Sequence, residues 1–228
     1  MSNRDRLAAL RDDIVVCRRC PRLVRWRERV ARERRGAFAD QEYWGRPVPS
    51  FGDPKARILV VGLAPAAHGG NRTGRIFTGD RSGDFLFASM HRAALASQPT
   101  SVSRDDGLTL TGAMVTAVNR CAPPGNRPKP QERDNCLPYL AREISLLDAL
   151  RVIVPLGSFA WDGVLRALAL IGLPAAMPRP RFGHLAESPI GPYVLLGSFH
   201  PSQQNTFTGK LTSEMLDAVF ERAVGLCR

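Results

Sequence analysis

The chain has 228 residues, which suits one ordinary domain or one domain with an appendage. Hydrophobic residues make up 44% and charged residues 23% of it, so a collagen-like, coiled-coil or disordered chain is excluded. The net charge of +11 favours a polyanionic partner, most simply nucleic acid, although the strong preference for arginine over lysine can also reflect codon bias. No apolar run reaches the roughly 20 residues of a spanning helix, and acids interrupt the N-terminal segment where a signal peptide needs an apolar core. We therefore expect a cytoplasmic protein.

Taken in chain order, residues 1–35 carry twelve arginines against five acids and are expected to form two short helices around a Cys-Arg-Arg-Cys-Pro segment. Residues 36–56 are rich in Gly and Pro without a hydrophobic period, which predicts a long connector. Continuous apolar runs then alternate with segments of helical spacing. The runs predict strands at 57–62, 113–118, 152–156 and 193–197, and the spacing predicts helices at 84–96, from about 135, at 159–170 and at 211–226.

This alternation predicts a three-layer α/β/α fold with a central four-stranded parallel sheet. We expect a single domain over residues 1–228, with 1–35 as a helical N-terminal segment and 57–228 as the α/β core. Ligands of such sheets bind beyond the carboxyl ends of the strands. All four loops that leave the predicted strands contain Gly, Pro, amide or histidine residues, so the functional site is expected at that edge.

Two familiar sites are excluded. Gly69 and Gly74 have P-loop spacing, but Arg75 and Ile76 follow in place of the lysine and the magnesium-binding hydroxyl. The segment 157–159 (GSF) lacks the second glycine of a nucleophile elbow, which argues against a serine hydrolase triad.

Five cysteines in a chain without an export signal are not expected to form disulfides. Cys17 and Cys20 are separated by two residues, Cys121 and Cys136 by fourteen, and Cys227 lies near the C-terminus. Four thiolates can hold zinc or an iron–sulfur cluster. The spacing alone leaves reduced, buried cysteines open as the alternative.

Three segments carry a family resemblance. They are GLAPAAHGGNRTGRIFTGD (62–80), NRCAPPGNRP (119–128) and SFHPSQQNTFTGKLT (198–212). In this order, with the four cysteines, they resemble the uracil-DNA glycosylase superfamily, and specifically family 5, the iron–sulfur B type. The resemblance runs from Cys17 to the last predicted helix. It implies a uracil-DNA glycosylase fold and hydrolytic excision of uracil, and of other deaminated bases such as hypoxanthine, from double-stranded DNA.

The resemblance also implies a [4Fe–4S] cluster on Cys17, Cys20, Cys121 and Cys136. A monomer associated with the nucleoid is expected. A second hypothesis stays open, in which the chain is a non-catalytic iron–sulfur or zinc nucleic-acid-binding module.

Excision puts positive charge on the sugar and negative charge on the departing base, so the enzyme must flip the nucleotide, hold the base, stabilise the anion and place a water molecule. His200 is expected to donate a hydrogen bond to the base. The family pattern gives Asp80 and Asn126 catalytic roles toward the sugar and the water. The alternatives are a satisfied loop histidine, a helix N-cap and a turn asparagine, respectively.

The first segment is expected to bind the base through Gly62, Ala64, Ala66 and a stacking Phe77, for which a plain core phenylalanine is the alternative. Many members carry an acidic or amide residue there that orients water, whereas this chain has Leu63, Ala66 and Ala67. The A type has a uracil-reading asparagine where this chain has Ala117, which predicts broader base acceptance. Asn119, two residues on and on the same strand face, is expected to substitute in part.

Contacts to DNA are expected from the loop after His200 and from basic residues of the first segment. The predicted set is Ser202, Gln203, Gln204, Asn205, Arg72, Arg75 and Lys210.

Overall fold

The computed structural model of the chain describes residues 2–175 and 177–228, and its strands form a mixed sheet. It contains β1 (Phe51–Gly52), β2 (Ile58–Gly62), β3 (Ala113–Ala117), β4 (Val152–Pro155), β5 (Glu187–Ile190) and β6 (Tyr193–Leu196), in the order β1-β3-β2-β4-β6-β5. The four predicted strands are confirmed and run parallel, as β3-β2-β4-β6. Two short antiparallel strands, β1 and β5, extend the sheet to six. They escaped prediction because β1 has two residues and β5 contains Pro189, which is tolerated at a sheet edge.

The helices are α1 (Asn3–Val15), α2 (Pro21–Glu33), α3 (Gly70–Thr73), α4 (Arg81–Arg92), α5 (Pro130–Leu146), α6 (Ser158–Leu170), α7 (Gln203–Phe207) and α8 (Ser213–Gly225). α5 begins five residues before the predicted start, because Pro130 occupies its first turn and the Glu132 carboxylate accepts the Lys129 amide at 2.7 Å. α3 and α7 were not predicted. No helix in the described part of the chain is long and apolar enough to cross a bilayer.

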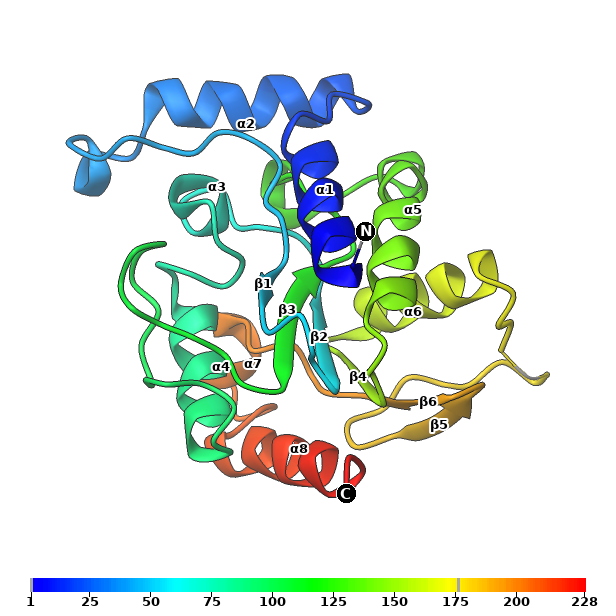
Figure 1. Cartoon of the computed structure of the whole chain (residues 1–228). Coiled ribbons are helices and arrows are strands. Elements are labelled where there is room, and N and C mark those ends of the chain that lie inside the picture. Colours follow the sequence, from blue (N-terminus) through cyan, green and yellow to red (C-terminus); the bar gives the residue numbers. More distant parts are fainter. Residues whose placement is uncertain (1, 176) are drawn as a thin grey trace.

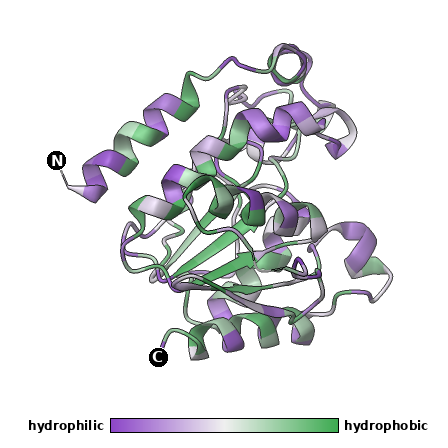
Figure 2. Ribbon diagram, turned by 90° about the vertical axis from the view of Figure 1, so that its right-hand side faces the viewer, coloured by the Kyte–Doolittle hydropathy of each residue, from purple (hydrophilic) through white to green (hydrophobic). Residues whose placement is uncertain are grey.

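Alternate residues of the buried strands face two separate cores. Ile58 and Val60 point to a core shared with α4 and α8, and Leu59 and Val61 point to a core shared with α5 and α6. The helices therefore cover both faces of the sheet, as predicted (Figure 1). Figure 2 shows hydrophobic strands between helices whose outer turns are hydrophilic.

β2 lies between β3 and β4, so the chain reverses its direction across the sheet after β3. In parallel sheets, ligands bind at such a switch point, beyond the carboxyl ends of the strands. α2 lies over this edge and contacts α3, while α1 packs on α5 (Figure 1). α2 therefore covers the same edge as the predicted site.

Candidate active site and cysteine cavity

The loops after β4 and β6 lie side by side at the carboxyl edge. Leu156 and Ser198 form a parallel bridge, and the Gly157 amide donates to the Ser198 carbonyl at 2.7 Å. Gly157 has φ +89°, and a Cβ on it would lie 3.4 Å from the Cβ of His200. The positive φ therefore favours glycine here, whereas a Cβ at that distance would make only an ordinary van der Waals contact with His200.

His200 lies half-buried beside Phe77, with 5.8 Å between the ring centroids. Burial lowers the pKa of its imidazole to about 4, so the ring is neutral at pH 7 and one nitrogen carries a proton that it can donate. The Asn205 side chain donates to the His200 carbonyl at 2.8 Å and fixes the loop.

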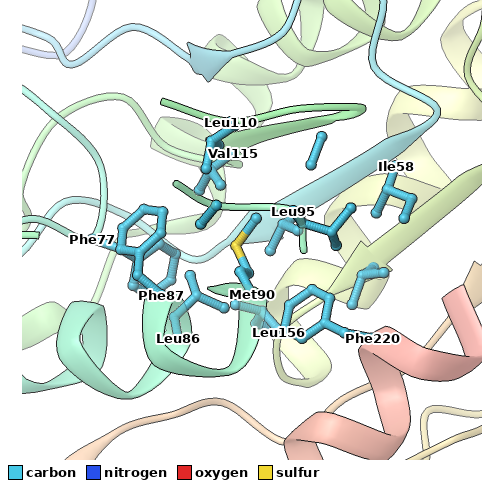
Figure 3. Packing of buried hydrophobic residues seen from close by; sticks show 14 of the residues in the cluster. Ile58, Phe77, Leu86, Phe87, Met90, Leu95, Leu110, Val115, Leu156 and Phe220 are labelled. Carbon is cyan, nitrogen blue, oxygen red and sulfur yellow. The ribbon is translucent and has the colours of Figure 1, made fainter. Parts of the chain in front are cut away.

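Phe77 is a core residue, as the alternative reading had it, and its role in stacking on a base stays a prediction. It is 8% exposed, packs beside Phe87 in the core of Figure 3, and has φ +53°, a conformation that a bulky residue adopts only at a cost in free energy. A Cβ on Gly62 would lie 2.7 Å from the Phe77 ring. The ring therefore covers the end of β2 next to His200, where a flipped base could stack.

Asn119 is a buried amide without partners. It is 0% exposed, and neither its Nδ2 nor its Oδ1 forms a hydrogen bond within the described residues. β3 ends at Ala117, and the amides of Val118 and Asn119 donate to the carbonyls of Gly62 and Leu63, so regular strand alternation does not continue through Asn119. Asn119 therefore lies just beyond the carboxyl end of β3, beside the start of the first loop. A buried amide normally finds partners, so these two atoms suit a ligand that supplies both a donor and an acceptor.

Asp80 caps α4, which confirms the capping alternative. Its Oδ1 accepts the Gly83 amide at 3.0 Å. Its Oδ2 lies close to Gly69, where a Cβ would come within 2.0 Å of it. Burial raises the pKa of the Asp80 carboxyl, with a smaller contribution from Asp84, while Gly83 and Arg72 oppose the rise. The cap occupies one oxygen and leaves the other for chemistry.

The first loop offers backbone donors. Ala64, Ala66 and Ala67 are half-buried, and within the described residues their amides donate no backbone hydrogen bond. These amides are available to a negatively charged group.

No contact in the described part of the chain joins Asn126 to these residues, so its catalytic role stays a prediction. It is exposed, has φ +56° in the turn Pro124–Asn126, and in the described part of the chain its side chain forms no hydrogen bond with Asp80 or His200. Its geometry is that of a turn asparagine.

The DNA-contact prediction for Arg72 and Arg75 is corrected by the structure, because both side chains are buried and hydrogen-bonded internally. Arg72 donates to the His68 and Gly79 carbonyls and to Gln41. Arg75 donates to Thr78, Ser101 and Asp106. Both brace the first loop from inside.

The polar side chains of the loop after His200 fall into two groups, those that hydrogen-bond within the loop and those that are exposed. Ser202 caps α7 through its hydroxyl, and Asn205 holds His200, so these two polar groups act within the loop. Gln203, Gln204 and Lys210 are exposed. Phe207, at the end of α7, was not predicted as a contact residue, although it is 69% exposed. An isolated aromatic residue in an otherwise polar loop could have indicated it in the sequence.

Four cysteines meet at one cavity beneath α2. Cys17 follows α1, Cys20 precedes α2, Cys121 follows β3, and Cys136 lies on α5; all four line the cavity. Cys227 lies apart, near Arg57. Among the described residues no three His, Cys, Asp or Glu side chains are arranged to hold a metal ion. The four thiols thus line one shared cavity.

A model of the uracil DNA glycosylase superfamily matches residues 49–223. The chain is 57% identical over 212 residues to a type-5 uracil-DNA glycosylase of Mycobacterium tuberculosis, covering 92% of this chain and 78% of that protein. It is 50% identical over 212 residues to a type-5 uracil-DNA glycosylase of Thermus thermophilus, covering 92% and 93%. A type-4 uracil-DNA glycosylase of Pyrobaculum aerophilum is 34% identical over 113 residues, covering 49% and 50%. These matches confirm the family resemblance.

Proposed function

The chain belongs to the uracil DNA glycosylase superfamily, and from this membership we propose that it excises uracil from DNA by hydrolysing the bond between deoxyribose C1′ and the base. The observation that carries the proposal is the buried amide of Asn119, which has no hydrogen-bond partner among the described residues and lies just beyond the carboxyl end of β3, at the sheet edge that also holds Phe77 and His200. A uracil edge presents an N–H donor beside a carbonyl acceptor, which matches the two free atoms of an asparagine amide.

The neighbouring residues suit the chemical steps. Phe77 stacks on the flipped base, and the neutral His200 donates to the carbonyl oxygen that becomes negative as the bond breaks. The amides of Ala64 and Ala66 add donors to the same anion. The second oxygen of Asp80 stabilises the positive sugar and accepts a proton from the attacking water, for which its raised pKa is suited.

Other deaminated bases are accepted for a related reason. Hypoxanthine presents the same N–H and C=O pair. Position 117 holds alanine instead of a second asparagine, so the site discriminates less strongly between uracil and other bases. We place the exposed Gln203, Gln204, Lys210 and Phe207 against the DNA, with Phe207 as an apolar wedge beside the emptied stack.

The cysteine cavity suits a [4Fe–4S] cluster on Cys17, Cys20, Cys121 and Cys136. The donor set consists of four thiols, and four thiolates are the standard ligands of such a cluster. When bound, the cluster supplies iron–thiolate bonds that join the N-terminal helices to the core. No step of the excision involves it.

The test uses duplexes that each carry one uracil or hypoxanthine, scored by alkali-labile cleavage. The proposed enzyme leaves an abasic site, whereas tight binding without cleavage would identify the non-catalytic module. Asn119→Leu removes the amide at similar volume. We expect uracil excision to fall at least tenfold while the free energy of unfolding stays equal or rises, because an unsatisfied buried amide is lost. Full activity of this variant would exclude Asn119 as the base reader.

A further inference from the structure

Arg27, on α2, is a buried cation without an anionic partner. Its side chain is 2% exposed, and within the described residues no carboxylate lies within ion-pair distance of it. The adjacent Glu28 pairs instead with Arg18 at 2.6 Å. Burying a guanidinium without a counter-charge is strongly unfavourable, so a folded chain that keeps one requires a negative group nearby.

The contacts of Arg27 show where that negative group belongs. Nη1 donates to the Sγ of Cys121 at 3.0 Å, and Nη2 donates to the Cys17 carbonyl at 3.3 Å. Nε has no partner within the described residues. The guanidinium therefore lies against two of the four cysteine segments.

A second fully buried arginine, which lines the cysteine cavity, differs from Arg27 in one respect. Arg120 is 1% exposed and lines the cavity, but it forms an ion pair with Glu143, which is also buried. Its charge is compensated inside the protein. Of the two, only Arg27 depends on the cysteine site for its counter-charge.

We propose that Arg27 is the counter-charge of the iron–sulfur cluster: it donates a hydrogen bond to the Cys121 ligand and raises the reduction potential of the cluster. The inference rests on the cluster assigned under the proposed function. Reduction adds one electron, and therefore negative charge, to a cluster already held by four thiolates. A fixed cation and an N–H donor at a ligand sulfur both favour the reduced form.

The test compares holoenzymes prepared without oxygen: the unaltered chain, Arg27→Gln, Arg27→Lys and, as a control, Arg25→Gln, whose side chain is exposed on the same helix. Iron and sulfide content is measured first, and the one-electron midpoint potential is then measured against an electrode. We expect Arg27→Gln to disfavour reduction at least tenfold, about 59 mV for one electron. Arg27→Lys keeps the charge, so its midpoint potential should fall by less than half of the fall expected for Arg27→Gln. The midpoint potential of Arg25→Gln should equal that of the unaltered chain.

A potential unchanged in Arg27→Gln would overturn the proposal, and so would equal shifts in the glutamine and lysine variants. If Arg27→Gln yields no loaded protein, Arg27→Lys provides the test, because a lysine ammonium keeps the charge but cannot make both contacts of the guanidinium. A midpoint potential of Arg27→Lys equal to that of the unaltered chain would then overturn the proposed hydrogen bond to Cys121. Absence of iron from the unaltered chain would instead refute the cluster itself, whatever the activity on uracil.

Discussion

The candidate site joins residues that are unusual for different physical reasons. The side-chain amide of Asn119 is buried and has no hydrogen-bond partner among the described residues, His200 is kept neutral by burial, and Phe77 has a left-handed backbone conformation. Each of these features costs free energy of folding, and all three occur at the carboxyl edge of the sheet. Such a concentration is typical of a site whose geometry is maintained for a ligand.

His200 is predicted to stabilise the leaving base. Removing one preorganised donor to a developing anion typically costs about 10²–10³ in rate, so His200→Ala should slow single-turnover excision by that factor while duplex binding stays near wild type. Because the pKa of His200 lies at about 4, the imidazole remains neutral over the range from pH 6 to 8, and its protonation should not shape the rate profile there.

A series of 5-substituted uracils tests the same point. Bases that leave easily need less stabilisation, so they should lose less activity than uracil in His200→Ala. Equal losses across the series would show that His200 positions the nucleotide and does not stabilise charge.

Asp80 is predicted to serve both as helix cap and as catalytic carboxylate, and two substitutions separate these roles. Asparagine caps a helix about as well as aspartate, so Asp80→Asn should unfold at the same temperature as the unaltered chain. We expect its excision rate to fall at least a hundredfold, because the carboxylate is lost. Asp80→Ala should lose about 1 kcal/mol of stability as well. Nearly full single-turnover activity of Asp80→Asn would mean that Asp80 is only a cap.

At the scale of elements, a buried ion pair fixes the first loop against the segment before β3. Arg75 donates to Asp106 at 2.6 Å, and Asp106 also accepts the amides of Val102 and Leu108. Burial favours the neutral acid, but the hydrogen bonds from Arg75 and these amides outweigh it and lower the pKa of Asp106 to about 2. This bracing holds the segment from which Phe77 projects.

The lowered pKa predicts acid sensitivity. Asp106 titrates near 3.9 when unfolded and near 2 when folded, so its contribution is fully present above about pH 4 and is lost as the pH falls toward 2. We expect roughly 2 kcal/mol at neutral pH. Asp106→Asn lacks this titration, so the difference in unfolding free energy between the two proteins should shrink from pH 5 to pH 2. A difference that stays constant over this range would contradict the prediction.

Elements with strong local patterns were predictable, and elements fixed by distant partners were not. Each parallel strand is an uninterrupted apolar run, and α8 follows its hydrophobic period within two residues at each end. α3 has four residues, and the buried Asn71 within it donates to the Arg27 carbonyl, a contact no local pattern reveals. Arg72 and Arg75 were misplaced because their partners, such as Gln41 and Asp106, lie about thirty residues away. The motifs located the site, but the sequence could not distinguish a buried arginine from an exposed one.

At the scale of the whole molecule, positive charge gathers over the carboxyl edge. α2 crosses that edge in Figure 1 and exposes Arg25, Arg29 and Arg32. Arg29 pairs with Glu33, whereas within the described residues Arg25 and Arg32 form no ion pair. The net charge of +11 is therefore partly concentrated beside the site, as DNA binding requires.

Binding to DNA is accordingly predicted to be largely electrostatic. The logarithm of the affinity should fall linearly with the logarithm of the salt concentration, because each neutralised phosphate releases about 0.9 counterion. The double variant Arg25→Gln/Arg32→Gln should weaken binding to every duplex and make the slope shallower by about 1 to 2. Arg222→Gln is the matched control, because this arginine lies on α8 and pairs with Glu187, away from α2. Equal salt slopes for the double variant and the control would mean that DNA binds away from α2. An affinity of the unaltered chain that does not change with salt would mean that its excess of arginine reflects composition and not DNA binding.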